Sequence, residues 1–298
     1  MTRLRKIMLE ELQRRNFSPT TIKRYLRSVE AFAQHFGRPP DQLGLEQIRS
    51  YQVYLLKERK MGVRTVGLHT AALRFFFCKT LKRNYPVEEF PYPKRPRSLP
   101  LILTHDEAVR LIESASNLFH RAMLMTLYST GMRRIELCNL KVENIDSERM
   151  LIHIRHGKGA RDRSVPLSPQ LLATLREYYR WMKPKTYLFP GAHGNWRVDK
   201  PITPKVVWIA CREAAQRAGI DKPVSPHLLR HSFATHLLEK GADLPTLQAL
   251  LGHAELKATA IYLHLSERHL KAAGTPIDQT EFSSLDKVKR SKSLHRKK

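Results

Sequence analysis

Residues 225–266, SPHLLRHSFATHLLEKGADLPTLQALLGHAELKATAIYLHLS, decide how the C-terminal part of the chain folds. Ser225 followed by Pro226 is typical of a helix start, which places His227 in the first turn. Backbone N–H groups in that turn favour an anion. Arg230 lies three residues further on, on the same helix face. A packed helix that presents His and Arg side by side is suited to binding phosphate.

The same stretch predicts a second helix, which carries another histidine and a tyrosine beyond its end. Asp243 and Pro245 mark the start of this helix, and it stops near Gly252. His253 follows immediately, and Tyr262 comes nine residues later after a polar turn. The stretch therefore supplies cationic, imidazole and phenol groups from consecutive short helices.

Length and composition indicate a globular protein with about two domains. The chain has 298 residues, of which 42% are hydrophobic, and its formal net charge is +26. Such a positive field attracts polyanions, so nucleic acid is the expected partner. Apolar runs fall short of the roughly 20 residues that cross a bilayer, and the N-terminus lacks an apolar signal core. Cys78, Cys138 and Cys211 fit buried reduced thiols, so we expect a cytoplasmic, nucleoid-associated protein without membrane contact.

The N-terminal part, residues 4–83, predicts a small bundle of four amphipathic helices. The clearest helix runs from Ser18 to Gly37, and further helices are expected over 45–60 and from residue 64 onward. The cluster Phe75–Phe77 is interpreted as core packing. Residues 1–100 contain 21 Lys or Arg and 8 Asp or Glu, which favours a surface that binds a nucleic-acid backbone.

Composition and periodicity divide the chain into four parts. Residues 1–85 form the helical DNA-binding domain, and the proline-rich, basic residues 86–99 form an extended linker. Residues 100–272 are expected to form the second domain, with a capping box at Thr104 and Glu107, a β-hairpin near residues 149–167, and helices over 168–182 and 203–218. The basic residues 273–298 are interpreted as a disordered tail that adds electrostatic affinity.

Patterns for metal or nucleotide chemistry are missing from the sequence. It contains no HExxH, no Cys/His zinc pattern, no GxxxxGK[ST] loop and no carboxylates with two-metal spacing. His227 and His231 have the i, i+4 spacing of zinc ligands, but no third ligand is evident, and we interpret His231 as structural or solvated. Charge on a bound phosphate must then come from Arg, Lys and His, so no cofactor or metal is expected.

Two further segments supply cations. In TGMRRIEL, residues 130–137, Gly131 breaks one helix and Arg133, two residues later, opens the next. Glu136 on the same short helix is expected to orient that arginine. Lys158 lies in the predicted hairpin turn of HGKGARDR, residues 156–163, from which it can reach outward.

Together these segments resemble the tyrosine recombinases, the phage integrase family. HLLRHSFAT, LGHAE and TAIYLHLS are similar to the C-terminal signature of that family, and TGMRRIEL is similar to its first arginine box. One departure is that Arg134 and Ile135 stand where an apolar and a small residue are common, so Arg133 is chosen by its spacing from Gly131. The spacing of the segments resembles the compact Xer-like and mobile-element members.

The resemblance implies a fold that is mainly α with a small β-hairpin or sheet. It implies a two-domain DNA clamp, in which an N-terminal, SAM-like core-binding bundle is followed by a tyrosine-recombinase catalytic domain. Six catalytic residues are implied: Arg133, Lys158, His227, Arg230, His253 and Tyr262.

The implied activity is site-specific recombination without metal or ATP. Tyr262 would attack a DNA phosphate and form a 3′-phosphotyrosyl link, while Lys158 would protonate the leaving 5′ oxygen and His227 would act as acid or base. The expected partners are double-stranded recombination sites and three further copies of the chain, or a related recombinase as hetero-partner.

Two alternatives stay open at this point. A type IB topoisomerase would use similar residues to relax DNA without a partner duplex. A DNA-binding accessory protein would have lost at least one cation or the tyrosine, and none is missing here. These residues are compatible with a resolvase of replicon dimers and with an integrase or transposition enzyme of a mobile element.

Overall fold

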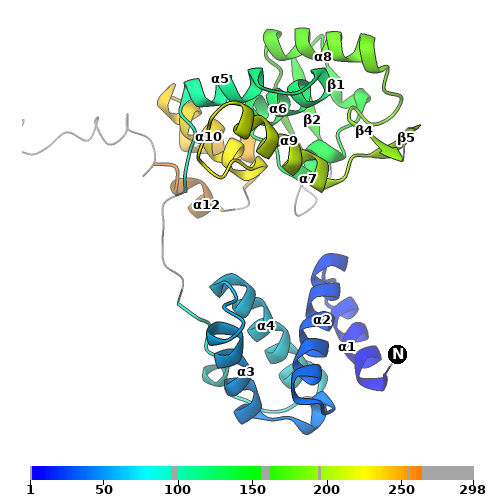
Figure 1. Ribbon diagram of the computed structural model, residues 1–298, viewed down its shortest axis with the longest axis vertical. Helices are drawn as coiled ribbons and strands as arrows, with labels where there is room; N and C mark the ends of the chain where they lie inside the picture. Colours follow the sequence, from blue (N-terminus) through cyan, green and yellow to red (C-terminus); the bar gives the residue numbers. More distant parts are fainter. Residues whose placement is uncertain (1, 95–99, 156–161, 194–195, 254, 264–298) are drawn as a thin grey trace, which may run out of the picture. The chain divides into compact units, whose positions relative to one another are not determined.

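A computed structural model describes residues 2–94, 100–155, 162–193, 196–253 and 255–263 of the chain. The chain divides into two compact units, Met1–Ser98 and Leu99–Lys298, and helices make up most of each (Figure 1). The mainly helical class with a small sheet, which the sequence predicts, is confirmed.

The first unit contains four helices, and the predicted starts and ends are largely confirmed. They are α1 (Arg3–Arg14), α2 (Pro19–Phe36), α3 (Leu45–Lys57) and α4 (Val63–Phe75), the last continued by a π turn over Phe76–Thr80. The Ser18 side chain caps α2 by accepting from the Thr21 backbone N–H, and Gly37 ends this helix in a left-handed conformation.

Aromatic packing fills the first unit, as the sequence predicts for its phenylalanine cluster. Phe76 and Phe77 are fully buried, and Phe32 packs edge-on against both Phe77 and Tyr51. Such edge-to-face pairs add stability beyond the area they bury. The bundle therefore has a core of its own.

The residues just after this bundle differ from the expected extended linker. Val87–Glu89 form a 3-10 turn, and Phe90 is fully buried in the core of the first unit. Arg49 also makes an ion pair with Glu89. Burying a phenylalanine side chain stabilises the folded chain by the hydrophobic effect. Residues 86–90 therefore pack against the bundle and do not extend into solvent.

The second unit combines eight helices of the described ranges with two small antiparallel sheets. The helices are α5 (His105–Glu113), α6 (Leu118–Thr130), α7 (Arg134–Cys138), α8 (Pro169–Met182), α9 (Pro204–Arg217), α10 (Pro226–Glu239), α11 (Leu244–Leu251) and α12 (Lys257–Ala260), with a 3-10 turn at Val142–Asn144. The predicted capping box of α5 is present, since Thr104 and Glu107 exchange hydrogen bonds.

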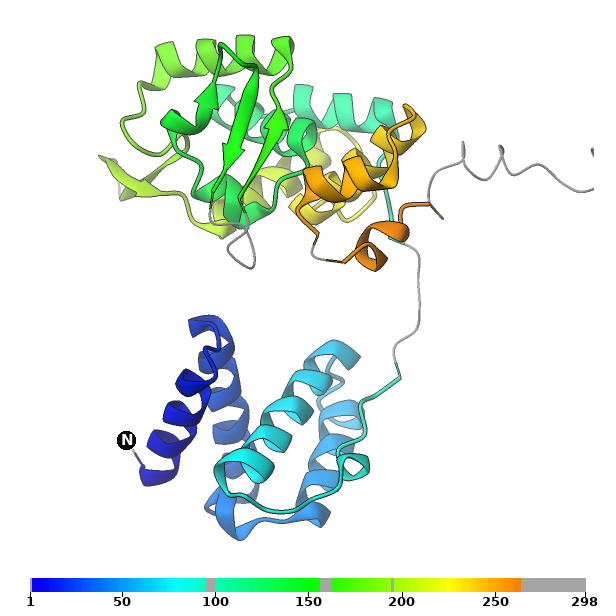
Figure 2. The ribbon, with the colours of Figure 1, turned by 180° about the vertical axis from the view of Figure 1, so that it is seen from behind.

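The larger sheet has the order β1-β2-β3 and lies along one side of the helices (Figure 2). Its strands are β1 (Ile145–Asp146), β2 (Leu151–Ile154) and β3 (Arg163–Pro166), and Ile152 pairs with Val165. The predicted hairpin strands are thus confirmed, whereas the turn between them, with Lys158, lies outside the described residues. A second hairpin, β4 (Pro190–His193) with β5 (Trp196–Pro201), was not predicted because its sequence lacks an apolar alternation.

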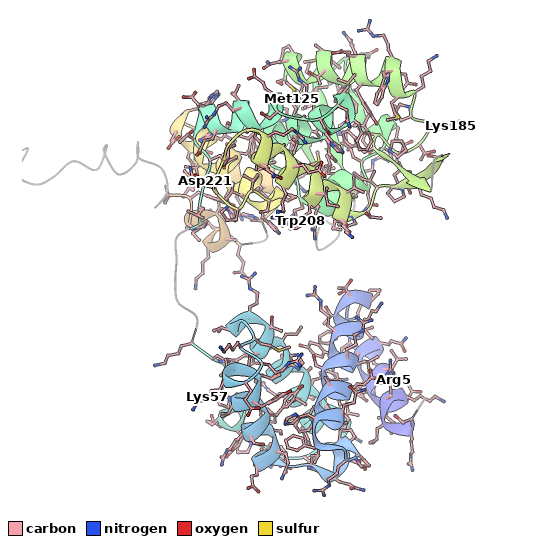
Figure 3. All side chains as sticks on the ribbon, in the orientation of Figure 1. Arg5, Lys57, Met125, Lys185, Trp208 and Asp221 are labelled. Carbon is pink, nitrogen blue, oxygen red and sulfur yellow. The ribbon has the colours of Figure 1, made fainter. Side chains whose placement is uncertain are left out.

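The core of the second unit lies between its helices and the β1–β3 sheet. It includes Met125, which lies among these helices in Figure 3, together with Ile152 and Leu229, all nearly or fully buried. Helix α10 packs against α6, α9 and α11. Among the described residues, no helix is long and apolar enough to cross a membrane.

Gly131 ends α6 at a point where the chain leaves no room for a side chain. Its φ of +58° is left-handed, and a Cβ built there would lie 2.3 Å from Cδ1 of Phe233 on α10. Only glycine accepts this conformation and this close approach without strain. Gly131 therefore allows α6 and α10 to come together.

We expect Gly131→Ala to destabilise the second unit strongly. The left-handed backbone alone costs about 1–2 kcal/mol, and overpacking against Phe233 adds about 1–3 kcal/mol. Gly219→Ala is the matched control, because Gly219 has a φ of +62° but nothing within 4 Å of its built Cβ. Denaturant unfolding followed by tryptophan fluorescence reports this unit, which contains all three tryptophans of the chain. Equal losses in the two variants would contradict the packing argument.

Candidate active site

Arg133 is held at the start of α7 by the helix itself. Its backbone N–H donates to Oε2 of Glu136 at 2.7 Å, and its Nη1 donates to Oε1 at 2.8 Å. Its Nη2 donates to the carbonyl of Gly252 at 3.1 Å. The predicted role of Glu136 in orienting this arginine is therefore visible, while Arg134 carries its charge near Cys138 instead.

Arg163, on β3, binds the carboxylate of Glu136 with two hydrogen bonds. Its Nη1 and Nη2 donate to Oε1 and Oε2 of Glu136 at 3.0 Å and 2.7 Å, and its Nε donates to the Leu250 carbonyl at 2.7 Å. Burial raises the pKa of Glu136, but hydrogen bonds from Arg163 and from the Arg133 backbone prevail and lower it to about 2. One buried carboxylate thus joins α7, β3 and the end of α11.

Arg230, on α10, is buried at the centre of the site with an exposed fraction of 4%. Its Nη1 donates to the carbonyl of Gly131 at 2.7 Å, and its Nη2 donates to the carbonyl of Leu251 at 2.7 Å. These two carbonyls come from the ends of α6 and α11, where they lack helical partners. Burial and the charge of Arg133 lower the pKa of Arg230 to about 10, so it stays charged at neutral pH.

His253 follows Gly252 and lies against Arg230. Its Nε2 is 3.0 Å from Nη2 of Arg230, and its Nδ1 is 2.9 Å from Oγ1 of Thr259. A guanidinium can only donate, so Nε2 accepts and the proton is on Nδ1. Burial and then the charges of Arg230 and Arg133 lower the pKa of His253 to about 4, which leaves the ring neutral at pH 7.

Tyr262 is buried against these groups within the same chain, with 2% of its surface exposed. Its hydroxyl is 3.0 Å from Nδ1 of His231, and its ring is stacked on that of His253 with centroids 6.4 Å apart. Burial raises the pKa of Tyr262, and the positive charges of Arg230 and Arg133 act in the opposite direction.

The structure therefore brings together four of the six residues predicted from the sequence. Arg133, Arg230, His253 and Tyr262 share one site, whereas Lys158 lies outside the described residues. His227 is exposed in the first turn of α10, and its ring is stacked on that of His231 at 6.4 Å.

Two residues of this site were missed in the sequence. Arg163 was read only as a strand residue of the predicted hairpin, and nothing in its local pattern pointed to Glu136. His231 was interpreted as structural or solvated, but it is half-buried and hydrogen-bonded to the Tyr262 hydroxyl. Its position directly after Arg230 on a helix was the signal available for placing it in the site.

The arrangement can bind an anion that carries negative charge on several oxygens. Arg133 and Arg163 are hydrogen-bonded to the single carboxylate of Glu136, and Arg230 adds a third guanidinium, so the site keeps a net positive charge. Guanidinium groups bind phosphate oxygens in pairs. Within the described ranges, no three His, Cys, Asp or Glu side chains are grouped as metal ligands would be.

Replacing Glu136 should remove stability in a pH-dependent way. The folded-state pKa of Glu136 lies below its ordinary value of 4.5, at about 2, so its contribution is present above pH 4.5 and is lost as the pH falls towards 2. That difference corresponds to about 3 kcal/mol. We therefore expect Glu136→Gln to be less stable than the wild type near pH 6, with a gap that shrinks on acidification.

The measurement is the free energy of unfolding by denaturant at a series of pH values, followed by tryptophan fluorescence. Glu143→Gln is the control, because the side chain of Glu143 is 60% exposed in its pair with Lys141 and surface pairs contribute little. A gap between the wild type and Glu136→Gln that is the same at pH 6 and pH 3 would show that the carboxylate is not held ionised.

Comparisons with known proteins match both the C-terminal and the N-terminal part of the chain. Residues 102–269 match the phage integrase family, and residues 4–87 match its N-terminal SAM-like domain. A Sinorhizobium fredii protein named as an integrase/recombinase, y4qK, is 47% identical over 93% of this chain and 89% of its own length. Tyrosine recombinase XerA of Pyrococcus horikoshii is 38% identical over 86% of this chain and 87% of its own.

Solved structures show the same fold. The crystal structure of XerA recombinase covers 94% of this chain and 99% of its own, with a TM-score of 0.54 and 32% identity. A lambda integrase tetramer bound to a Holliday junction has a TM-score of 0.69 over 86% of this chain and 74% of its own, at 18% identity. The chain thus belongs to the phage integrase family and is a Xer-like tyrosine site-specific recombinase that acts on DNA.

Proposed function

We propose that this chain cleaves and rejoins DNA through a covalent link between Tyr262 and a 3′ phosphate. The observation that carries the proposal is the burial of the Tyr262 hydroxyl beside the charges of Arg230 and Arg133 within a single chain. A nucleophile and the cations that neutralise its target are thereby held ready in one place. The phosphotyrosyl link conserves the energy of the broken bond, so rejoining requires no ATP.

The described side chains receive roles that follow from their surroundings, and Lys158, which lies outside the described residues, receives its role from the family resemblance. Arg133 and Arg230 bind the non-bridging oxygens of the scissile phosphate, because both are charged and rigidly held. His253 lies beside Arg230 and adds a hydrogen bond to the same phosphate once DNA displaces Arg230 from its Nε2. The proton of the neutral ring is then on Nε2, which donates to the phosphate, and Nδ1 accepts from the hydroxyl of Thr259. His227, exposed at the start of α10, acts as an acid or base near the DNA, and Lys158 protonates the leaving 5′ oxygen.

The partners that we propose are double-stranded recombination sites and further copies of this chain. A solved XerH recombinase is bound to its difH substrate, and lambda integrase forms a tetramer on a Holliday junction. By analogy, four protomers exchange strands between two duplexes. They are either four copies of this chain or copies of this chain together with a related recombinase. Each of the two units contacts the duplex, residues 91–99 link them, and residues 273–298 add affinity for its backbone. These sites lie on nucleoid DNA in the cytoplasm.

Replacing Tyr262 tests the proposal directly. Tyr262→Phe should bind DNA as the wild type does but form no covalent adduct, because it keeps the ring and loses the attacking oxygen. The assay incubates the protein with a pool of nicked random-sequence duplexes and recovers the DNA that remains attached after denaturation in detergent. Sequencing the attached DNA also identifies the recombination site.

The control for this variant is Tyr179→Phe, which changes an exposed tyrosine on α8. This control should form the adduct at the rate of the wild type. An adduct that persists in Tyr262→Phe would refute the assignment of the nucleophile.

Replacing Lys158 tests the proposed acid. Lys158→Ala should slow cleavage by about 100-fold or more on ordinary DNA, because the 5′ oxygen then leaves without a proton. A duplex with sulfur in place of that bridging oxygen should restore the rate, since a thiolate leaves without protonation. Lys185→Ala, at a surface lysine outside the site (Figure 3), is expected to cleave both duplexes normally. If Lys158→Ala cleaves the duplex with bridging sulfur as slowly as it cleaves ordinary DNA, Lys158 is not the acid.

A further inference from the structure

The Tyr262 hydroxyl has an imidazole in contact with it that the sequence did not assign to the chemistry. Nδ1 of His231 lies 3.0 Å from this oxygen, and the two ring centroids are 5.5 Å apart. His231 is fixed by α10, one residue after the buried Arg230, so the contact joins the helix of the central arginine to the segment that follows α12. This geometry is within reach of direct proton transfer.

A buried phenol that attacks phosphorus must lose its proton to another group. Burial raises the pKa of Tyr262, so its hydroxyl is protonated at neutral pH. The nearby charges of Arg230 and Arg133 favour the phenolate, but they carry no lone pair that can receive a proton. The site therefore needs a base in contact with the hydroxyl.

The other two imidazoles are less suited to this task. Both ring nitrogens of His253 are engaged, with Nε2 paired to Arg230 and Nδ1 to Thr259. His227 is exposed one turn before His231, with its ring centroid 6.4 Å from that of His231, on the side of α10 that opens to solvent.

We propose that His231 is the general base that takes the proton of Tyr262 when this tyrosine attacks DNA, and that it returns the proton when the strand is rejoined. The inference rests on the proposed role of Tyr262 as nucleophile. It makes His231 a catalytic residue, because its Nδ1 contacts the attacking oxygen itself.

The groups around His231 keep it in the form that the step requires. Burial and then the charges of His227 and Arg230 on the same helix lower the pKa of His231. The ring is therefore neutral at pH 7, and Nδ1 can accept while the proton of the neutral ring is on Nε2. When His231 becomes an imidazolium, the negative charge that develops on the phosphate oxygens compensates for repulsion from the charge of Arg230.

The step balances without an added reactant. The bond between Oη of Tyr262 and phosphorus forms, the bond between phosphorus and the 5′ oxygen breaks, and the phenolic proton moves to Nδ1 of His231. The departing oxygen receives its proton from the acid, for which Lys158 is the proposed donor. In the return reaction a 5′ hydroxyl gives its proton to Lys158 and bonds to phosphorus, the bond between phosphorus and Oη of Tyr262 breaks, and His231 returns its proton to the leaving phenol.

His231→Asn separates proton transfer from positioning. An asparagine amide keeps a hydrogen-bonding atom close to the position of Nδ1 but cannot take up a proton. We expect single-turnover adduct formation on the identified site to fall by about 100-fold or more. His231→Gln, with a longer amide side chain, should show the same loss and provides a second variant if the first folds poorly.

The chain offers a matched control on the same helix. Nδ1 of His236 lies 2.7 Å from the hydroxyl of Tyr128, away from the proposed site. His236→Asn makes the same chemical change to the same kind of contact. It should form the adduct at a rate close to that of the wild type, and tryptophan fluorescence checks that each variant is folded.

Fluorinated tyrosine at position 262 supplies a readout that a purely structural role would not move. Ring fluorination lowers the pKa of the phenol, so it reduces the need for a base. We expect 3,5-difluorotyrosine in place of Tyr262 to accelerate His231→Asn much more than it accelerates the protein with His231 intact. Fluorination that accelerates His231→Asn and the protein with His231 intact equally would overturn the role of His231 as base. Normal rates of adduct formation in both His231→Asn and His231→Gln would do the same, and neither result would affect the role of Tyr262. A wild-type chain that forms no adduct would instead contradict the role of Tyr262.

Discussion

The buried guanidinium of Arg230 is the interaction on which the rest of the site depends. Its Nη1 donates to the carbonyl of Gly131 at the end of α6. Its Nη2 donates both to the carbonyl of Leu251 at the end of α11 and to Nε2 of His253. A cation with only 4% of its surface exposed is stable only with such partners, since an unpaired buried charge is costly. The packing of α6, α10 and α11 therefore depends on the same hydrogen bonds that place the charge of Arg230.

A second set of contacts extends this arrangement to the sheet. Glu136 binds Arg133 and Arg163 together, and both arginines also donate to carbonyls near the end of α11. The carboxylate offsets part of the positive charge without occupying the outward side of Arg133, whose side chain remains 21% exposed. The result is a rigid, positively charged site that needs little reorganisation to bind a phosphate.

Burial gives the histidines and the tyrosine of this site distinct protonation behaviour. Burial and neighbouring cations lower the pKa values of His253 and His231, which keeps both rings neutral. Burial raises the pKa of Tyr262, so its hydroxyl keeps its proton. Groups of this kind, with their pKa values moved by a shared environment, are typical of catalytic sites. The direct contact between a neutral imidazole and a protonated phenol gives this pattern a chemical use.

The sequence by itself determined the mainly helical class, most helix starts and the identity of four clustered site residues. Capping residues and the spacing around Gly131, Arg230 and Tyr262 are local signals, so they could be read without a structure. The partnership of Arg163 with Glu136 and that of His231 with Tyr262 span 27 and 31 residues, and only the tertiary structure decided them. Such pairs depend on which helix ends and strands pack together, and the burial of Phe90 likewise depends on a core that forms only in the folded chain.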